Sequence, residues 1–115
     1  MAERRMFSRR ILERDDFLDL PHTTQILYIH LAMNADDDGF VDCARKVTRM
    51  VGAAKEDIEL LETTGFLLSF ENGLCAVTHW KIHNYIQKDR YRPTVYTAEL
   101  NRLVAEKGEP YQAIW

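Results

Sequence analysis

The stretch that decides the fold runs from Phe66 to Trp80 and reads FLLSFENGLCAVTHW. Two apolar segments flank Asn72-Gly73, the dipeptide that best accepts the positive φ angles of a two-residue type I′ turn. Such a turn pairs Glu71 with Leu74 in an antiparallel hairpin. Alternation along the two strands then places one set of side chains on a common face: Phe66, Leu68, Phe70, Cys75, Val77 and His79.

The hairpin continues directly into KIHNYIQKDRYRPTVY, residues 81–96, which is basic, aromatic and too irregular for a strand. A hairpin with a charged tail is typical of nucleic-acid binding. The tail is followed by an apolar pattern over Thr97–Glu106 that predicts a last helix, with Thr97 as its cap. The final residues, YQAIW, are apolar and can dock on the domain.

Upstream of the hairpin, the pattern predicts helices at about residues 8–20, 22–35, 43–51 and 55–64. Ser8 and Asp42 are suitable N-caps, and Gly65 suits the position after the fourth helix. In the third helix we expect three residues to face inward: Val47, Met50 and Val51. The sequence GFVD, residues 39–42, reads as a short strand.

This order of elements predicts an α+β fold, a winged helix-turn-helix with an extra N-terminal helix and a C-terminal helical extension. The 115 residues suffice for a single domain, 1–115. Within it we distinguish an N-terminal helix and arm (1–20), a winged-helix core (21–82), and a basic aromatic tail with a terminal helix (83–115).

Three consecutive aspartates and a glycine, Asp36 to Gly39, can be read as a cation-binding loop or as a turn. An EF-hand loop needs alternating ligands and a distant glutamate, whereas these acids are consecutive. Asp and Gly accept the backbone conformations that turns require. We therefore predict a turn, with no metal site and no cofactor.

Composition narrows the class of protein. There is no apolar stretch of membrane-spanning length and no signal-peptide pattern, so we expect a soluble cytoplasmic protein with no membrane partner. Cys43 and Cys75 are far apart and are expected to be reduced. No phosphate-binding loop, nucleophile elbow or catalytic pairing is recognisable, so we predict no enzymatic activity and no catalytic residue.

The net charge of −3 conceals strong segregation along the chain. Residues 1–14 carry +3, residues 15–44 carry −7 and residues 76–96 carry +3. The predicted fourth helix, KEDIELLETT, carries −3, although the equivalent helix of a winged helix-turn-helix reads the major groove. An acidic helix is poorly suited to phosphates, so we assign it to a protein partner or a second copy.

The longer sequence pattern resembles the N-terminal domain of phage replisome organiser proteins, relatives of DnaD-like replication-initiation proteins. The residues that carry the resemblance are MFSRRILERDDFLDLP, LYIHLAMNADDDGFV, RMVGA, the FLLSFE hairpin and, most specifically, THWKIHNYIQKDRYRPTVY. The resemblance implies a winged-helix domain that binds origin DNA, self-associates and helps to recruit helicase-loading proteins. In that family a separate C-terminal region commonly follows.

The cations outside the acidic helix are the candidates for DNA contacts. Arginines of the N-terminal arm form one group, and we expect the tail to contribute most, supported by the third helix. The predicted DNA-binding residues are Arg45, Lys46, Arg49, Lys81, Lys88, Arg90, Tyr91 and Arg92. The face of the third helix that carries Arg45 and Arg49 is equally consistent with an ordinary solvated surface.

The aromatic residues of the tail have two interpretations, base stacking and packing. Packing is favoured for Trp80 and Tyr85, whereas both remain open for Tyr91. Asn84 is read as a loop cap in preference to an adenine contact. Two further functions compete with replication-related DNA binding: a protein-interaction or oligomerisation domain that docks a helicase loader, and a winged-helix transcriptional regulator.

Overall fold

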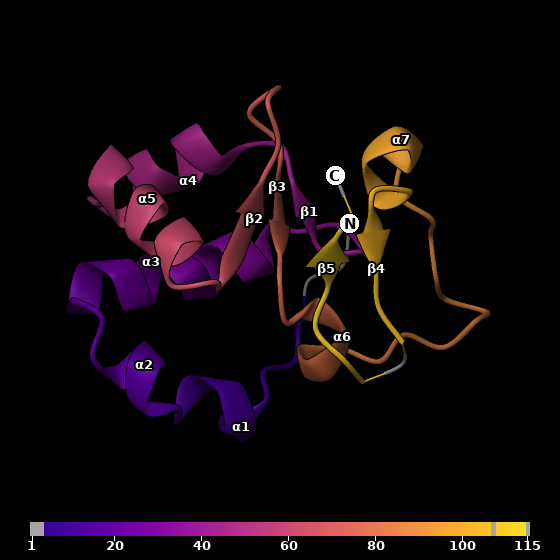
Figure 1. The fold of residues 1–115 in the computed structure, drawn as a ribbon, viewed down its shortest axis with the longest axis horizontal. Helices are drawn as coiled ribbons and strands as arrows, with labels where there is room; N and C mark the ends of the chain where they lie inside the picture. The colour runs from indigo at the N-terminus through magenta and orange to yellow at the C-terminus, as the bar shows by residue number, and fades with distance from the viewer. Residues whose placement is uncertain (1–3, 107, 115) are drawn as a thin grey trace.

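The computed structural model describes residues 4–106 and 108–114, which form a mixed helix and strand fold (Figure 1). The helices are α1 (Arg9–Leu12), α2 (Asp15–Leu18), α3 (His22–Met33), α4 (Ala44–Met50), α5 (Lys55–Thr63), α6 (Trp80–His83) and α7 (Thr97–Leu100). The strands are β1 (Phe40–Val41), β2 (Leu67–Ser69), β3 (Cys75–Val77), β4 (Leu103–Val104) and β5 (Gln112–Ala113). The expected α+β class is confirmed.

The central sheet is antiparallel, in the order β1-β3-β2. Helices α3, α4 and α5 lie on one side of it, and the segment that carries β4, β5 and α7 lies on the other (Figure 1). This arrangement buries all three residues of β3, because both faces of the central strand are covered. Among the described residues, no helix combines the length and apolarity needed to cross a bilayer.

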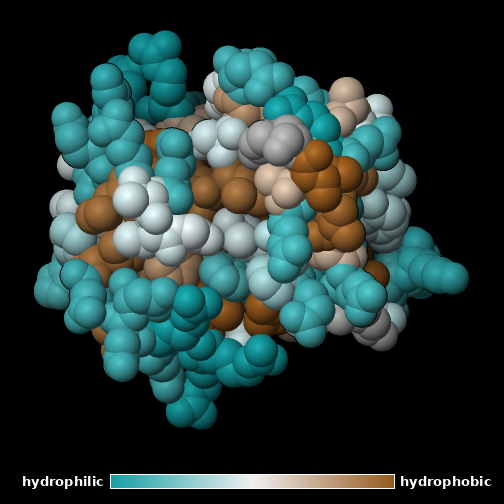
Figure 2. Space-filling model, viewed as in Figure 1, coloured by the Kyte–Doolittle hydropathy of each residue, from teal (hydrophilic) through white to brown (hydrophobic). Residues whose placement is uncertain are grey.

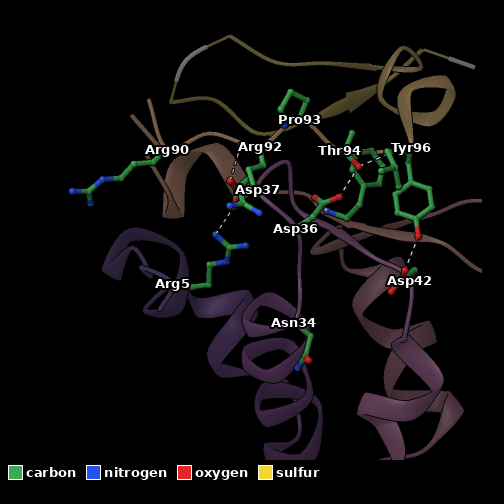
Figure 3. Close-up of a pocket in the computed structure, with 12 residues that line it drawn as sticks. Arg5, Asn34, Asp36, Asp37, Asp42, Arg90, Arg92, Pro93, Thr94 and Tyr96 are labelled. Carbon is green, nitrogen blue, oxygen red and sulfur yellow. Dashed lines mark hydrogen bonds and ion pairs between the residues drawn. The ribbon is translucent and has the colours of Figure 1, made fainter. Parts of the chain in front are cut away.

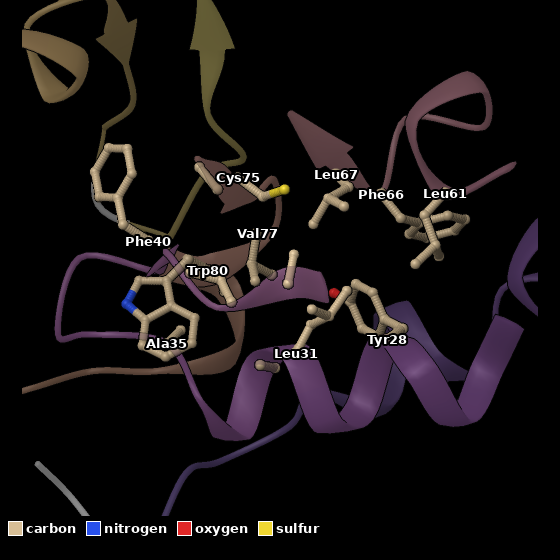
Figure 4. Packing of buried hydrophobic residues seen from close by; sticks show 14 of the residues in the cluster. Tyr28, Leu31, Ala35, Phe40, Leu61, Phe66, Leu67, Cys75, Val77 and Trp80 are labelled. Carbon is tan, nitrogen blue, oxygen red and sulfur yellow. The ribbon is translucent and has the colours of Figure 1, made fainter. Parts of the chain in front are cut away.

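Helix α3 supplies the centre of the core. Leu27, Tyr28 and Leu31 are fully buried. Tyr28 and Leu31 point from α3 toward the residues of the sheet and α5 (Figure 4). The ring of Tyr28 lies 5.3 Å from that of Phe17 and 5.8 Å from that of Phe66, both edge to face. These aromatic contacts join α2, α3 and the start of the hairpin, and edge-to-face pairs stabilise such a cluster beyond the area they bury.

The hairpin forms where expected, but its turn and register differ from the prediction. Phe70 N–H donates to the Leu74 carbonyl at 2.8 Å, so the loop holds three residues, Glu71 to Gly73, not two. Gly73 has φ +83°, while no described non-glycine residue has positive φ. Asn72 instead uses its side chain, which accepts from Leu74 N–H at 3.2 Å. This geometry is a type I turn closed by a glycine.

The altered turn shifts the pairing by one residue. Ser69 pairs with Cys75 and Leu67 with Val77, so these side chains share a face. The predicted grouping of Phe66, Leu68 and Phe70 with the odd-numbered residues of the second strand is therefore wrong. The second strand also ends earlier than expected, since Trp80 opens α6.

The C-terminal helical extension is corrected as well, because α7 ends at Leu100 and the chain becomes extended. Leu103 pairs with Ala113 in a β4–β5 hairpin. Tyr111 fixes this hairpin to the sheet: it is buried, and its N–H donates to the Thr78 carbonyl at 2.8 Å. Burial of Tyr111 and Leu103 outweighs the weak helical pattern of residues 101–106. Docking of the YQAIW segment is thus confirmed for Tyr111.

Ser8 caps α1 as predicted, accepting from Arg10 N–H at 3.2 Å. Two other details of the helices, at Asp42 and Met50, differ from expectation. Asp42 does not cap α4, because its carboxylate accepts the Tyr96 hydroxyl at 2.6 Å. Met50 is 60% exposed, so the inward face of α4 is formed by Val47 and its neighbours.

Candidate nucleic-acid interface

The acidic loop between α3 and β1 is a turn, as predicted. The Asp36 carboxylate accepts the N–H groups of Asp38 at 3.0 Å and Phe40 at 2.9 Å. Gly39 completes the turn with φ +88° and lies against Trp80. Among the described residues, no group of three or more His, Cys, Asp and Glu side chains is placed to hold a metal ion.

The same loop holds the basic tail, which the sequence did not reveal. Both carboxylate oxygens of Asp38 accept the Tyr91 hydroxyl at 2.7 Å, and one also accepts Thr94 N–H at 2.8 Å. Asp37 accepts Arg92 N–H at 3.0 Å, and Asp36 accepts the Thr94 hydroxyl. Residues 91–94 are thereby fixed against the start of β1 (Figure 3). We call Asp36, Asp37 and Asp38 the aspartate loop.

The N-terminal arm is fixed to the same place. The Arg5 side chain is only 4% exposed, donates to Asp37 at 3.0 Å and to the Ala35 carbonyl at 2.6 Å, and lies 5.0 Å from the centre of the Trp80 ring. Asn84 accepts Met6 N–H at 2.8 Å, so its side chain supports the distant N-terminal arm, whereas we expected it to cap its own loop. Arg5 is therefore a structural cation and is unsuited to phosphate binding.

Two surface grooves follow the tail, and the aspartate loop contributes to both. The first has a volume of about 460 Å³ and includes Arg90 and Arg92 in its wall (Figure 3). The second has a volume of about 660 Å³ and is lined by a mixture of aromatic and basic side chains, with Asp37 common to both grooves. Five of the predicted residues thus come together around the tail: Lys81, Lys88, Arg90, Tyr91 and Arg92.

The cations of α4 form a separate group. Arg45, Lys46 and Arg49 are all exposed, while Val47 and Thr48 between them are buried. They lie outside the described linings of both grooves. Hydrophilic side chains cover much of the periphery in Figure 2, and apolar atoms reach the surface beside the C-terminal hairpin.

Charge pairing distinguishes these cations from others in the chain. The four salt bridges among the described residues use Arg5, Arg9, Arg14 and Arg102. None involves a predicted DNA-binding residue. The side-chain charges of the α4 group and of Lys88, Arg90 and Arg92 are thus presented to solvent, within the part of the chain that is described.

Helix α5 presents an acidic surface, as expected. Glu56, Glu59 and Glu62 are exposed at three-residue spacing and share one side of the helix. Asp57 differs from them, because it accepts from Ala54 N–H at 2.9 Å and from the hydroxyls of Thr23 and Thr24. These hydrogen bonds, led by that of Thr24, lower the pKa of the Asp57 carboxyl.

The tail aromatics take different roles. Trp80 is a packing residue, as predicted: it is 2% exposed and its Nε1–H donates to the Asp37 carbonyl at 2.9 Å. Tyr85 is 59% exposed, so the prediction that it packs in the interior is wrong. Tyr91 is 37% exposed, and partial burial together with the hydrogen bond to Asp38 raises the pKa of its phenol.

Two buried histidines connect α6 to the rest of the fold. His83 accepts Ser8 N–H at Nδ1, at 2.8 Å, while its Nε2 lies 2.7 Å from the Tyr28 hydroxyl. His79 Nε2 lies 3.2 Å from the Arg14 guanidinium, which can only donate. Burial lowers the pKa of both histidines to about 4, aided at His79 by the charge of Arg14. Both are therefore structural and neutral near pH 7.

Comparisons of the chain with protein-family models, with curated proteins and with solved structures found no match.

Proposed function

We propose that the chain is a winged-helix DNA-binding module of a phage or prophage replisome organiser, acting in the cytoplasm at the initiation of replication. The order α3-β1-α4-α5-β2-β3, with the antiparallel β2–β3 hairpin as the wing, supports the winged-helix assignment. The observation that carries the proposal is the set of exposed cations on α4 and the tail that make no salt bridge with a described residue.

Two of the acids close to these cations are directed into the fold, whereas Asp89 is exposed. Asp38 is 6% exposed and receives the Tyr91 hydroxyl and Thr94 N–H, and Asp37 pairs with Arg5. The three exposed cations Lys88, Arg90 and Arg92 therefore outnumber the one exposed acid of residues 81–96 on the surface that phosphates can reach. Neutralising phosphates with such side chains releases condensed counterions, which gives affinity without requiring a particular sequence.

The tail contribution is tested by replacing Lys88, Arg90 and Arg92 together with alanine. All three are exposed, so the fold should be retained. Each phosphate contact contributes about 0.9 to the slope of log K against log salt, and three lost contacts should lower its magnitude by up to about 2.7. Fluorescence anisotropy with a labelled origin-region duplex measures the slope across a salt series.

The matched control replaces Glu56, Glu59 and Glu62 with glutamine. These changes remove an equal number of charges of opposite sign from α5, and we expect DNA affinity to stay equal or to rise. If the triple alanine variant of the tail binds duplex DNA with the parental slope, the tail is not the phosphate-binding surface.

A second function, protein interaction, is favoured by the acidic side of α5. Three exposed glutamates beside the single exposed cation Lys55 suit a basic surface on a second copy or on a helicase-loading protein. Static light scattering of the parent and of the glutamine variant tests self-association. A monomer at high concentration with intact DNA binding would exclude the oligomer version.

A further inference from the structure

The second groove has the chemistry of a ligand site that phosphate contacts alone do not explain. Its volume of about 660 Å³ lies within the range of small-molecule sites. Its wall combines Tyr85, Tyr91 and Ile86 with the cations Lys81 and Lys88. Aromatic surface beside cations suits a ligand that is itself both flat and anionic.

The two tyrosines differ in exposure. Tyr85 lines the groove and is 59% exposed, so part of its surface is open to a ligand, whereas Tyr91 is 37% exposed. Tyr91 is fixed, because its hydroxyl lies 2.7 Å from both carboxylate oxygens of the buried Asp38. A ring that is already fixed loses little conformational entropy when a ligand stacks on it.

The charges of the groove favour an anion. Lys81 is positioned by the Tyr111 ring, whose centre lies 5.7 Å from Nζ, and Lys88 is exposed. The groove also contains Asp37 and Asp38, but Arg5 pairs with Asp37, and Asp38 is 6% exposed. Solvent-facing charge in the groove is thus carried by the lysines.

We propose that this groove binds an unpaired nucleobase and its phosphate, as presented by single-stranded nucleic acid. The base stacks on Tyr85 beside the fixed ring of Tyr91, and the phosphate meets Lys88 or Lys81. Bases within a duplex are stacked on both faces and cannot enter a groove in this way, so the site selects single strands. This inference rests on the proposed nucleic-acid binding and adds a strand preference to it.

The test compares Tyr85→Ala with Tyr85→Phe, which keeps the ring. The probes are a fluorescein-labelled oligothymidylate and a duplex of the same length, measured by anisotropy at one salt concentration. Removing a stacking ring costs about 1–3 kcal/mol per base, so Tyr85→Ala should weaken single-strand binding roughly 5- to 150-fold. Tyr85→Phe should bind as the parent does, and duplex affinity should change little in both variants.

A cation control tests whether the effect belongs to this groove. Lys88→Ala should weaken single-strand binding, whereas Lys55→Ala, on α5 and outside the groove lining, should leave it nearly unchanged. Parental single-strand affinity in Tyr85→Ala, with duplex binding intact, would overturn the groove assignment and leave the proposed function standing. If the parent binds neither the oligothymidylate nor the duplex, both the groove assignment and the proposed function are overturned. If thymidine monophosphate competes as tightly as the oligothymidylate, the ligand is a free nucleotide and the assignment to single-stranded nucleic acid is overturned.

Discussion

The aspartate loop makes a strong prediction: Asp38→Asn should loosen the tail and destabilise the fold. Asp38 is buried, and its carboxylate accepts from Tyr91 and from Thr94 N–H. An asparagine side chain keeps the shape, and its single oxygen can still accept from both donors, but it carries no charge and places an amide N–H₂ where the second acceptor stood. Both hydrogen bonds therefore lose their charge assistance.

The magnitude follows from these contacts. Hydrogen bonds to charged groups contribute about 1.5–3 kcal/mol and neutral ones about 0.5–1.5 kcal/mol, so each of the two bonds loses about 1 kcal/mol. Relief of a buried charge offsets part of this loss. We expect a net loss of about 1 kcal/mol in the free energy of unfolding. With a urea m-value of about 1–3 kcal/mol/M, the midpoint should fall by roughly 0.5 M.

Urea unfolding followed by circular dichroism measures the global effect, and hydrogen exchange of the Thr94 amide measures the local one. Asp89→Asn is the matched control, because Asp89 is an exposed aspartate of the same tail, and its midpoint should not move. An Asp38→Asn variant with the parental midpoint and an unchanged Thr94 exchange rate would refute the reasoning that the loop holds the tail.

Two further predictions concern stability. Gly39→Ala should lower the free energy of unfolding by several kcal/mol, because the new Cβ would lie 2.6 Å from Cγ of the buried Trp80. Gly73→Ala is the control: it has a similar φ and nothing within 4 Å, so the loss should be about 1 kcal/mol. Thermal unfolding of both variants measures the difference, and equal losses would contradict the clash with Trp80. Burial holds the pKa of His79 and His83 near 4, below an unfolded value near 6.5, so the contribution of the neutral histidines to stability is complete above pH 6.5 and is lost toward pH 4. Between pH 7 and 5 the free energy of unfolding, followed by urea midpoints, should fall by about 2 kcal/mol per histidine. Constant midpoints over this range would contradict the burial of neutral histidines.

Element types were predictable from sequence wherever one local signal dominated. The apolar pattern of residues 22–33, the cap Ser8 and the glycine at Gly65 each act within a few residues of their own position. The exposed α4 cations were found for the same reason, since the buried residues between them define the outer face. Local physics was sufficient in these cases.

The prediction of the hairpin register was wrong because two turn types are possible at the same dipeptide. Asn72-Gly73 suits a type I′ turn, but a type I turn closed by Gly73 needs only one positive φ. The Asn72 side chain then adds hydrogen bonds to Leu74 N–H and to Glu99, 27 residues away. The contact with Glu99 cannot be predicted from the residues close to Asn72 in sequence.

The prediction of a terminal helix was wrong, and the role of the aspartate loop was missed, for a related reason. Leu103–Val104 form a strand in place of a helix because Tyr111 docks on the sheet, and the tail is shaped by acids more than 50 residues earlier. A signal was present in the sequence: three acids with no local ligand pattern, and a tail rich in Tyr, Thr and Arg that can donate to them. Its pairing required the three-dimensional arrangement.

The distance along the chain between the aspartate loop and its partners also sets an order of events during folding. Tyr91 and Thr94 follow Asp38 by 53 and 56 residues, so these contacts close a long loop and form only after the elements between them have assembled. During synthesis, α3 and the aspartates emerge well before the tail donors that hydrogen-bond to Asp38. Arg5 emerges before the aspartates, so the ion pair with Asp37 can form while Asp38 still waits for its partners from the tail.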